Sequence, residues 1–190
     1  GDWVRTYSDK DRRISIASAI NDPKKRSYST GPASSVFNKK NKQGFEDDLG
    51  NECLGSYWNC SGTTTPWGTV LSAEEYYASH APEPVRSDGS SFPTNTVPFI
   101  PSMGNGFGNI LGLAGNKYGW AVEVDPSNKE DYGTKHTMLG RYFHEAFAVN
   151  SKKDMPIAIY SGCDRKGGHI YKFISEESTS NPKSKTNSIW

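Results

Sequence analysis

Short runs of β-prone residues, bounded by Gly, Pro and Asp, are the main pattern in the second half of the chain. Apolar and aromatic positions alternate or cluster over residues 118–124, 147–149, 157–160 and 168–174, and an earlier run covers 67–71. Short strands with turn residues between them are typical of antiparallel all-β proteins. The pattern therefore predicts an antiparallel all-β fold, with a propeller or a sandwich as the leading architectures.

Polar stretches surround this strand-rich part. Residues 1–50 carry basic clusters and only short apolar pieces, which predicts loops with isolated strands. Residues from about 80 to 117 are rich in Pro and Gly, as in a long insertion with few regular elements. We therefore divide the chain into a polar N-terminal segment (1–50), a strand-bearing portion (51–174) that contains the insertion, and an exposed polar tail (175–190).

Composition narrows the function classes. The 22 Lys and Arg against 21 Asp and Glu give a net charge of +1, without the basic excess of a nucleic-acid-binding protein. No apolar run has the length of a transmembrane helix. The cysteines Cys53, Cys60 and Cys163 form no C-x-x-C pair, so neither a zinc ribbon nor a disulfide framework fits them. We expect Cys53 and Cys163 to be structural.

Acidic residues stand at strand ends or beside turns, where a sheet can hold them rigidly. Together with Cys60, on a polar Gly- and Thr-rich stretch, they offer hard oxygen donors and one soft thiolate. Such a set suits a site with iron and calcium rather than one type of ion. The acidic candidates are Glu74, Glu75, Glu123, Asp125, Glu145 and Asp164. On spacing alone, solvated carboxylates at strand ends are the competing interpretation.

Local context separates some of these candidates. Glu74 and Glu75 point to opposite faces if they lie in one strand, so one is expected to be a ligand and the other to be solvated. Glu123 stands in an otherwise apolar strand, where a lone carboxylate is costly unless it is paired or bound to metal. Asp125, which precedes Pro126, is more simply a turn residue.

Four segments in this order resemble the PhoX-type alkaline phosphatases. They are NCSGTTTPWGTVLSAEE (59–75), YGWAVEVDP (118–126), LGRYFHEAF (139–147) and YSGCDRKGGHIYKF (160–173). The resemblance implies a six-bladed β-propeller whose active site joins a di-iron (Fe³⁺) centre to Ca²⁺ ions and hydrolyses phosphate monoesters. It also implies an exported protein, periplasmic or extracellular. A chain of 190 residues holds too few strands for six blades, so we expect a fragment, or a ring completed by a second chain.

The resemblance also implies roles for individual residues. Arg141 would face the substrate phosphate, with Asn59 and Arg165 beside it, and the catalytic set would be Arg141, Cys60 and Glu145. The implied metal ligands are Cys60, Glu75, Glu123, Glu145 and Asp164.

Two other functions remain open at this point. One is a non-catalytic calcium-binding propeller fragment that serves as a binding or structural module. The other is a hydrolase that uses Cys60 as its nucleophile and His144 as its base, although no oxyanion-hole motif supports it. We further expect Trp67, Trp120 and Tyr171 to be core aromatics.

Overall fold

The computed structural model describes residues 8–37, 47–79 and 113–184, and the fold of these residues is mostly β. The strands are β1 (Ser27–Thr30), β2 (Glu52–Cys53), β3 (Asn59–Thr64), β4 (Val70–Glu74), β5 (Ala121–Val124), β6 (Thr134–His136), β7 (His144–Asn150), β8 (Met155–Cys163) and β9 (Ile170–Thr179). The helical segments are α1 (Ile16–Asn21), α2 (Ser34–Phe37) and the short 3-10 helices η1 (Pro23–Lys25), η2 (Tyr77–Ser79), η4 (Gly115–Lys117) and η5 (Thr137–Leu139).

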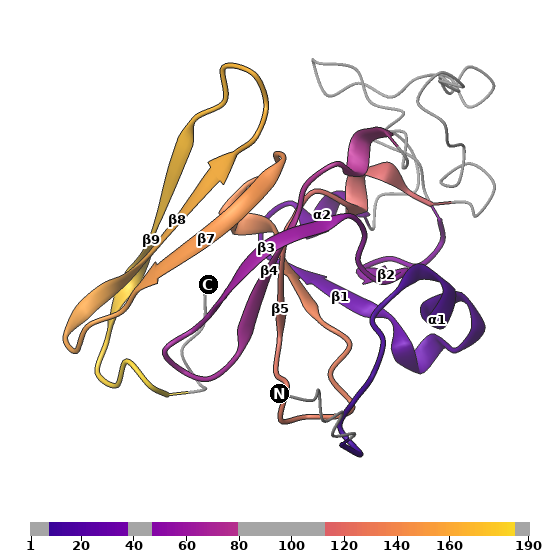
Figure 1. Ribbon diagram of the computed structural model, residues 1–190, viewed down its shortest axis with the longest axis horizontal. Helices are drawn as coiled ribbons and strands as arrows, with labels where there is room; N and C mark the ends of the chain where they lie inside the picture. The colour runs from indigo at the N-terminus through magenta and orange to yellow at the C-terminus, as the bar shows by residue number, and fades with distance from the viewer. Residues whose placement is uncertain (1–7, 38–46, 80–112, 185–190) are drawn as a thin grey trace, which may run out of the picture.

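The strands form two sheets (Figure 1). The first has six strands in the order β2-β1-β6-β5-β4-β3, and the second has three in the order β7-β8-β9. All neighbouring pairs are antiparallel except β1 and β6, which run parallel. The expectation of a purely antiparallel fold was therefore wrong for β1, which joins the sheet from the polar N-terminal segment. Among the described residues neither sheet has the four strands of a propeller blade.

The main core lies between the two sheets, where β7 packs against β3 and β4. Leu71 and Ala73 of β4 and Ile157 and Ile159 of β8 contribute inward-facing side chains, because alternate residues of a strand share one face. Phe147 of β7 completes the contact between the sheets. Trp67 and Trp120 are buried as expected, whereas Tyr171 stays 38% exposed.

The N-terminal segment contains helices that the sequence pattern did not predict. The α1 helix begins after Ser15, whose hydroxyl accepts a hydrogen bond from the backbone N–H of Ser18, and it ends before Pro23. Its residues Ile16 and Ala19 pack in a second core with Leu54, Tyr77, Leu113 and Tyr118. Six residues are too few to display a helical period clearly, and packing rather than local propensity stabilises such a helix.

One of the sequence-derived boundaries needs revision. Strand β9 continues to Thr179, and Ser175 and Thr179 are buried, so the first residues of the expected polar tail belong to the sheet. The expected insertion lies outside the described residues except for 113–117, which include η4 and are buried.

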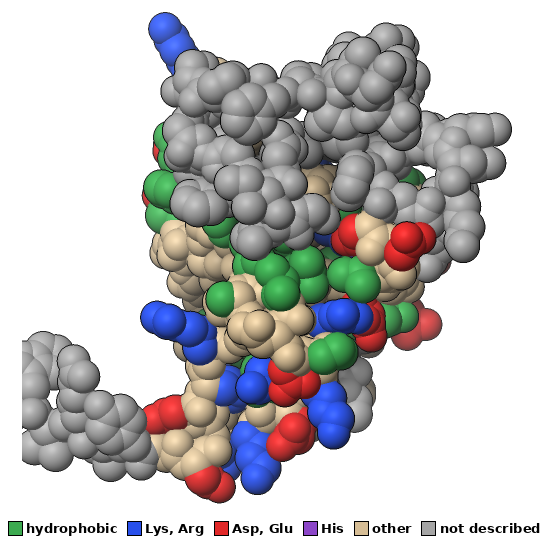
Figure 2. Space-filling model, turned by 90° about the vertical axis from the view of Figure 1, so that its right-hand side faces the viewer, with side chains coloured by type: hydrophobic (Ala, Val, Ile, Leu, Met, Phe, Trp, Pro, Cys, Tyr) green, Lys and Arg blue, Asp and Glu red, His purple; other side chains and the backbone are tan. Residues whose placement is uncertain are grey.

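The face of the molecule beside α1 carries charged side chains of both signs (Figure 2). Blue and red side chains are interspersed there around a group of hydrophobic ones. This mixture agrees with the net charge of +1. Separately, none of the helices in the described part of the chain is both long and apolar enough to cross a membrane.

Candidate metal centre

Cys60, Glu75 and Glu145 come together in the tertiary structure. One ligand atom from each residue lies within 4.8 Å of the others, and the Cys60 Sγ is 3.7 Å from Oε1 of Glu145. Cys60 lies on β3, Glu75 directly follows β4, and Glu145 lies on β7 of the other sheet. Glu75 is buried and Cys60 is exposed, so the cluster forms an acidic site that opens to solvent.

A β-bulge places Cys60. Asn59 pairs with Glu74 and Gly62 with Ser72, so three steps along β3 are matched by only two along β4. Such a bulge bends its strand and turns a side chain out of the regular alternation. A Cβ at Gly62 would lie 2.4 Å from a backbone carbonyl oxygen of β4, so this tight approach requires glycine.

A second bulge, on β7, places Glu145. His144 pairs with Cys163 and Phe147 with Ser161, so three steps along β7 are matched by two along β8. Glu145 lies within this irregular stretch. Since β7 packs against β3, the two bulges bring a thiol and a carboxylate of different sheets together.

Asp164 completes an acidic surrounding for Glu75. It follows β8, its backbone N–H donates to the carbonyl of Phe143, and its carboxyl group shares a hydrogen bond with Glu75. Desolvation and this hydrogen bond raise the pKa of Glu75. The pKa of the Cys60 thiol is also raised, by desolvation and then by the two neighbouring glutamates.

The donor set fits a metal centre. Several groups that become anionic on deprotonation are crowded together, and a cation bound among them would favour their charged forms. Carboxylate oxygens suit calcium and hard iron, and a thiolate suits iron. Cys60, Glu75 and Glu145 therefore form a candidate ligand group, and Asp164 is connected to it through its hydrogen bond with Glu75.

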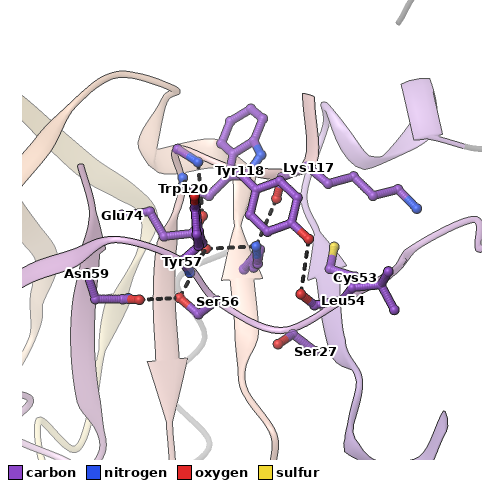
Figure 3. Close-up of polar contacts among 12 residues, drawn as sticks. Ser27, Cys53, Leu54, Ser56, Tyr57, Asn59, Glu74, Lys117, Tyr118 and Trp120 are labelled. Atoms are coloured by element: carbon purple, nitrogen blue, oxygen red, sulfur yellow. Dashed lines mark hydrogen bonds and ion pairs between the residues drawn. The ribbon is translucent and has the colours of Figure 1, made fainter. Parts of the chain in front are cut away.

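Glu74 points away from this cluster, as the alternation of strand residues requires. The expectation that the non-ligand member of the Glu74–Glu75 pair is solvated was wrong, because Glu74 is fully buried. Its Oε1 lies 2.8 Å from Nζ of Lys135, which is also fully buried. Figure 3 shows the hydrogen bonds around Glu74. Glu74 and Lys135 thus form a buried ion pair.

Glu123 lies in a different hydrogen-bond network. Its carboxylate accepts hydrogen bonds from Trp67 Nε1, at 2.7 Å, and from the Thr69 hydroxyl, and it lies 2.7 Å from Nε2 of His136. Desolvation by burial opposes ionisation, but hydrogen bonding and the charge of His136 prevail and lower the pKa of Glu123. Pairing within the protein therefore accounts for the carboxylate in this apolar strand.

Arg141 holds two segments of backbone together. Its Nε donates to the carbonyl of Tyr118 at 2.7 Å and its Nη2 to that of Gly115 at 2.8 Å, and its guanidinium lies over the ring of Tyr77. Two nitrogens of the guanidinium therefore donate hydrogen bonds within the protein. Asn59 is similarly engaged, because it accepts from Ser56 and donates to Ser72.

Arg165 and Arg141 line a pocket of about 390 Å³ between the η5 segment and the inner face of β8 and β9. Among the described residues around it, the cations are Arg141, Arg165 and Lys172, and none is acidic. Arg165 is exposed and its Nε donates to Sγ of Cys163 at 3.3 Å. Arg165 directly follows Asp164, so one short segment of backbone connects the lining of this pocket to the residue that is bonded to Glu75.

His144 is not arranged as a base for Cys60. Its Nδ1 lies 2.9 Å from the hydroxyl of Ser161 and its Nε2 lies 3.0 Å from the carbonyl oxygen of Gly140. Burial lowers the pKa of His144 to about 4. The raised pKa of Cys60 is also the opposite of what an activated thiol nucleophile needs. The geometry therefore disfavours the Cys–His hydrolase considered from the sequence.

Sequence reasoning missed Lys135 and the buried role of Glu74. Lys135 lies in the short polar run Thr134–His136, where nothing in the sequence distinguishes an internal lysine from a solvated one. Only the register of β6 against β5, and of β5 against β4, brings its ammonium group to Glu74.

Comparison with known proteins gives the chain a family. Residues 2–189 match the family model of alkaline phosphatase PhoX. The chain is also similar to a solved structure of Pseudomonas fluorescens PhoX in complex with vanadate, a transition state analogue, with a TM-score of 0.63 and 27% identity. That similarity covers 95% of this chain and 31% of the other, so the chain spans less than a third of that protein's length. No curated protein matches significantly. Because the family match extends over nearly the whole chain, the chain belongs to the PhoX family of alkaline phosphatases.

Proposed function

We propose that the protein hydrolyses phosphate monoesters at a metal centre held by Cys60, Glu75, Glu145 and Asp164. The observation that carries this proposal is the convergence of a thiol and two carboxylates within 4.8 Å. Membership of the PhoX family supports it, as does the vanadate bound to the similar Pseudomonas protein, since vanadate is described there as a transition state analogue.

We propose iron and calcium as the metals. A thiolate favours iron over calcium, whereas a group of carboxylates accommodates both. Bound together, such cations supply charge neutralisation for a phosphate group and activation of an oxygen nucleophile. The protein's own part is to hold the four ligands rigidly, through the two bulges and the buried setting of Glu75.

The substrate phosphate is expected beside Arg165 and Arg141. A guanidinium can donate to two phosphate oxygens at once, and the pocket that both residues line has no acidic side chain among its described walls. Arg165 is the better candidate for direct contact, because it is exposed while Arg141 binds backbone carbonyls. Asn59, bonded to Ser56 and Ser72, contributes to the arrangement next to Cys60.

The wider setting is also part of the proposal. The two sheets would belong to a larger β-propeller that a remaining part of the protein or a second chain completes, in keeping with the 31% coverage of the similar structure. The protein would act in the periplasm or outside the cell, where calcium is plentiful.

The test is elemental analysis of the full-length protein, purified without chelators, combined with hydrolysis of a simple aryl phosphate. Cys60→Ser and Glu145→Gln should lose bound iron and at least about 100-fold in kcat/KM, since even the loss of a residue that only supports a ligand costs 10–100-fold. Glu176→Gln changes an exposed carboxylate of β9 and should behave like the wild type. Bound calcium without iron or turnover would instead indicate a non-catalytic calcium-binding module.

A further inference from the structure

We propose that the buried pair of Glu74 and Lys135 is a positioning device that fixes Cys60 and Glu75 in the geometry needed to bind metal. Glu74 would act through these two residues without touching the metal or the substrate. The inference rests on the proposed metal centre, and it assigns a role to a pair of charges that the centre itself does not use.

Glu74 gathers donors from several segments on one carboxylate (Figure 3). Oε1 accepts from the hydroxyl of Ser56 at 3.0 Å, from the backbone N–H of Tyr57 at 3.2 Å and from Nζ of Lys135 at 2.8 Å. Oε2 accepts from the backbone N–H groups of Gly119 at 2.9 Å and Trp120 at 3.1 Å. One side chain thereby connects the segments that lead into β3 and β5 with the end of β4 and with β6.

The segment that leads into β3 delivers Cys60. Trp58 has a φ of 50°, a left-handed conformation that is unfavourable for a bulky residue and persists only where its surroundings fix it. Its neighbour Tyr57 is bound by Glu74, and its own carbonyl accepts the N–H of Glu75 at 3.1 Å. Glu74 and Glu75 thus hold this strained turn from two sides, two residues before Cys60.

The segment that leads into β5 is held in the same way. Gly119 has a φ of 91°, which favours glycine, and a Cβ there would lie 2.3 Å from the ring of Tyr77. In this conformation the N–H of Gly119 donates to Oε2 of Glu74. The backbone N–H of Glu74 in turn donates to the carbonyl of Trp120 at 3.3 Å. The end of β4, from which Glu75 projects, is therefore fixed against β5 by both side-chain and backbone bonds.

Lys135 completes the device from β6. Its Nζ donates to Glu74 and, at 2.9 Å, to the carbonyl of Lys117, and it lies 4.1 Å from the centre of the Tyr118 ring. A buried ion pair is weak evidence for stability, because the desolvation of both charges offsets their attraction. What Glu74 provides beyond packing is a set of directed hydrogen bonds to the backbone of the segments that lead into β3 and β5, which flank the end of β4 where Glu75 lies.

The experiment is a titration of the metal-free full-length protein with Co²⁺. Binding is monitored by the absorption band of charge transfer from the thiolate to cobalt. The double variant Glu74→Gln/Lys135→Met removes both charges and so leaves neither unpaired. Glu74→Asp keeps the charge beside Lys135 but is one methylene shorter, so it tests the reach of the carboxylate in a milder variant. Near-ultraviolet circular dichroism and thermal unfolding establish that each variant is folded.

The matched control is a second buried ion pair, Lys117 with Asp47, at 2.6 Å. The control variant Lys117→Met/Asp47→Asn loses a pair of similar burial that makes no side-chain hydrogen bond to the backbone on either side of Cys60 or Glu75. In this control variant the Kd for Co²⁺ should stay within about twofold of the wild-type value, even if the Tm falls. Substitutions at distant sites without shared partners have independent effects.

Both Glu74 variants should raise the Kd for Co²⁺ by about 10–100-fold and weaken the charge-transfer band, the loss typical of residues that orient metal ligands. Wild-type values of Kd and band intensity in both Glu74 variants would overturn the positioning role while leaving the metal centre intact. So would an equal loss in the control pair, because it would show a general effect of stability. A wild-type protein without the band, or a band that survives Cys60→Ser, would overturn the proposed centre itself and this inference with it.

Discussion

Cys60 and Glu145 lie 85 positions apart in the chain and on strands of different sheets, yet the thiol sulfur of one is 3.7 Å from a carboxylate oxygen of the other. Each residue lies where its strand gains one extra residue against its neighbour. In a regular strand the direction of a side chain is set by alternation alone, and a bulge changes that direction. The pair is therefore a product of two local irregularities and of the packing of β7 on β3.

Gly62 is expected to be essential for the first of these bulges. In Gly62→Ala the new methyl group would lie 2.4 Å from the carbonyl oxygen of Leu71, so β3 has to move. We expect a loss of about 1–3 kcal/mol in the free energy of unfolding, as for other overpacked sites, and weaker metal binding. Gly162→Ala in β8 is the control, because its methyl group meets nothing within 4 Å. Urea unfolding and metal titration check both variants, and equal behaviour of the two would contradict the role of the bulge.

Glu123 should contribute to stability in a pH-dependent manner. Its pKa is lowered in the folded protein, so its stabilisation is present above the ordinary value of 4.5 and is lost as the pH falls through the lower folded value. Glu123→Gln should therefore unfold more easily at neutral pH, by about 1–3 kcal/mol, and show a shallower loss of stability below pH 4.5. Urea unfolding across this range measures the effect. Loss of bound metal in this variant would show that Glu123 is a ligand after all.

The two arginines of the pocket should respond differently to substitution. Arg165→Ala removes an exposed cation, and we expect a KM for aryl phosphate raised about tenfold, equivalent to one charge-assisted contact, with an unchanged Tm. Arg141→Ala takes the donors away from two backbone carbonyls, so its Tm should fall. Steady-state kinetics and thermal unfolding of both variants distinguish these roles. An unchanged KM in Arg165→Ala would remove this residue from the phosphate site.

Metal removal should destabilise the folded protein through the acidic cluster. A ligand that binds only the folded state adds about 2.7 kcal/mol when its free concentration is 100 times its Kd. Adding Ca²⁺ or iron to the chelator-treated protein should accordingly raise the Tm, and the rise should be much smaller in Glu75→Gln. Differential scanning calorimetry with and without metal gives the answer. A rise of the same size in Glu75→Gln would place the bound metal elsewhere.

The sequence determined much of the strand content, because alternation of apolar residues is a local signal. The predicted runs at 118–124, 157–160 and 168–174 overlap β5, β8 and β9. The short helix α1 and the parallel pairing of β1 with β6 were beyond such a signal. The first depends on packing against Leu54 and Tyr118, and the second joins segments more than 100 residues apart.

The resemblance of four segments to the PhoX family also came from the sequence alone, and the family match confirms it. The choice among candidate ligands did not. Glu74, Glu75 and Glu123 are all carboxylates in or beside strands, but one pairs with Lys135, one joins Cys60 and one meets His136. Residue type and spacing fix the chemistry that a side chain can offer. Only strand register, two bulges and the contact between the sheets decide which groups meet, because those depend on residues far away in the chain.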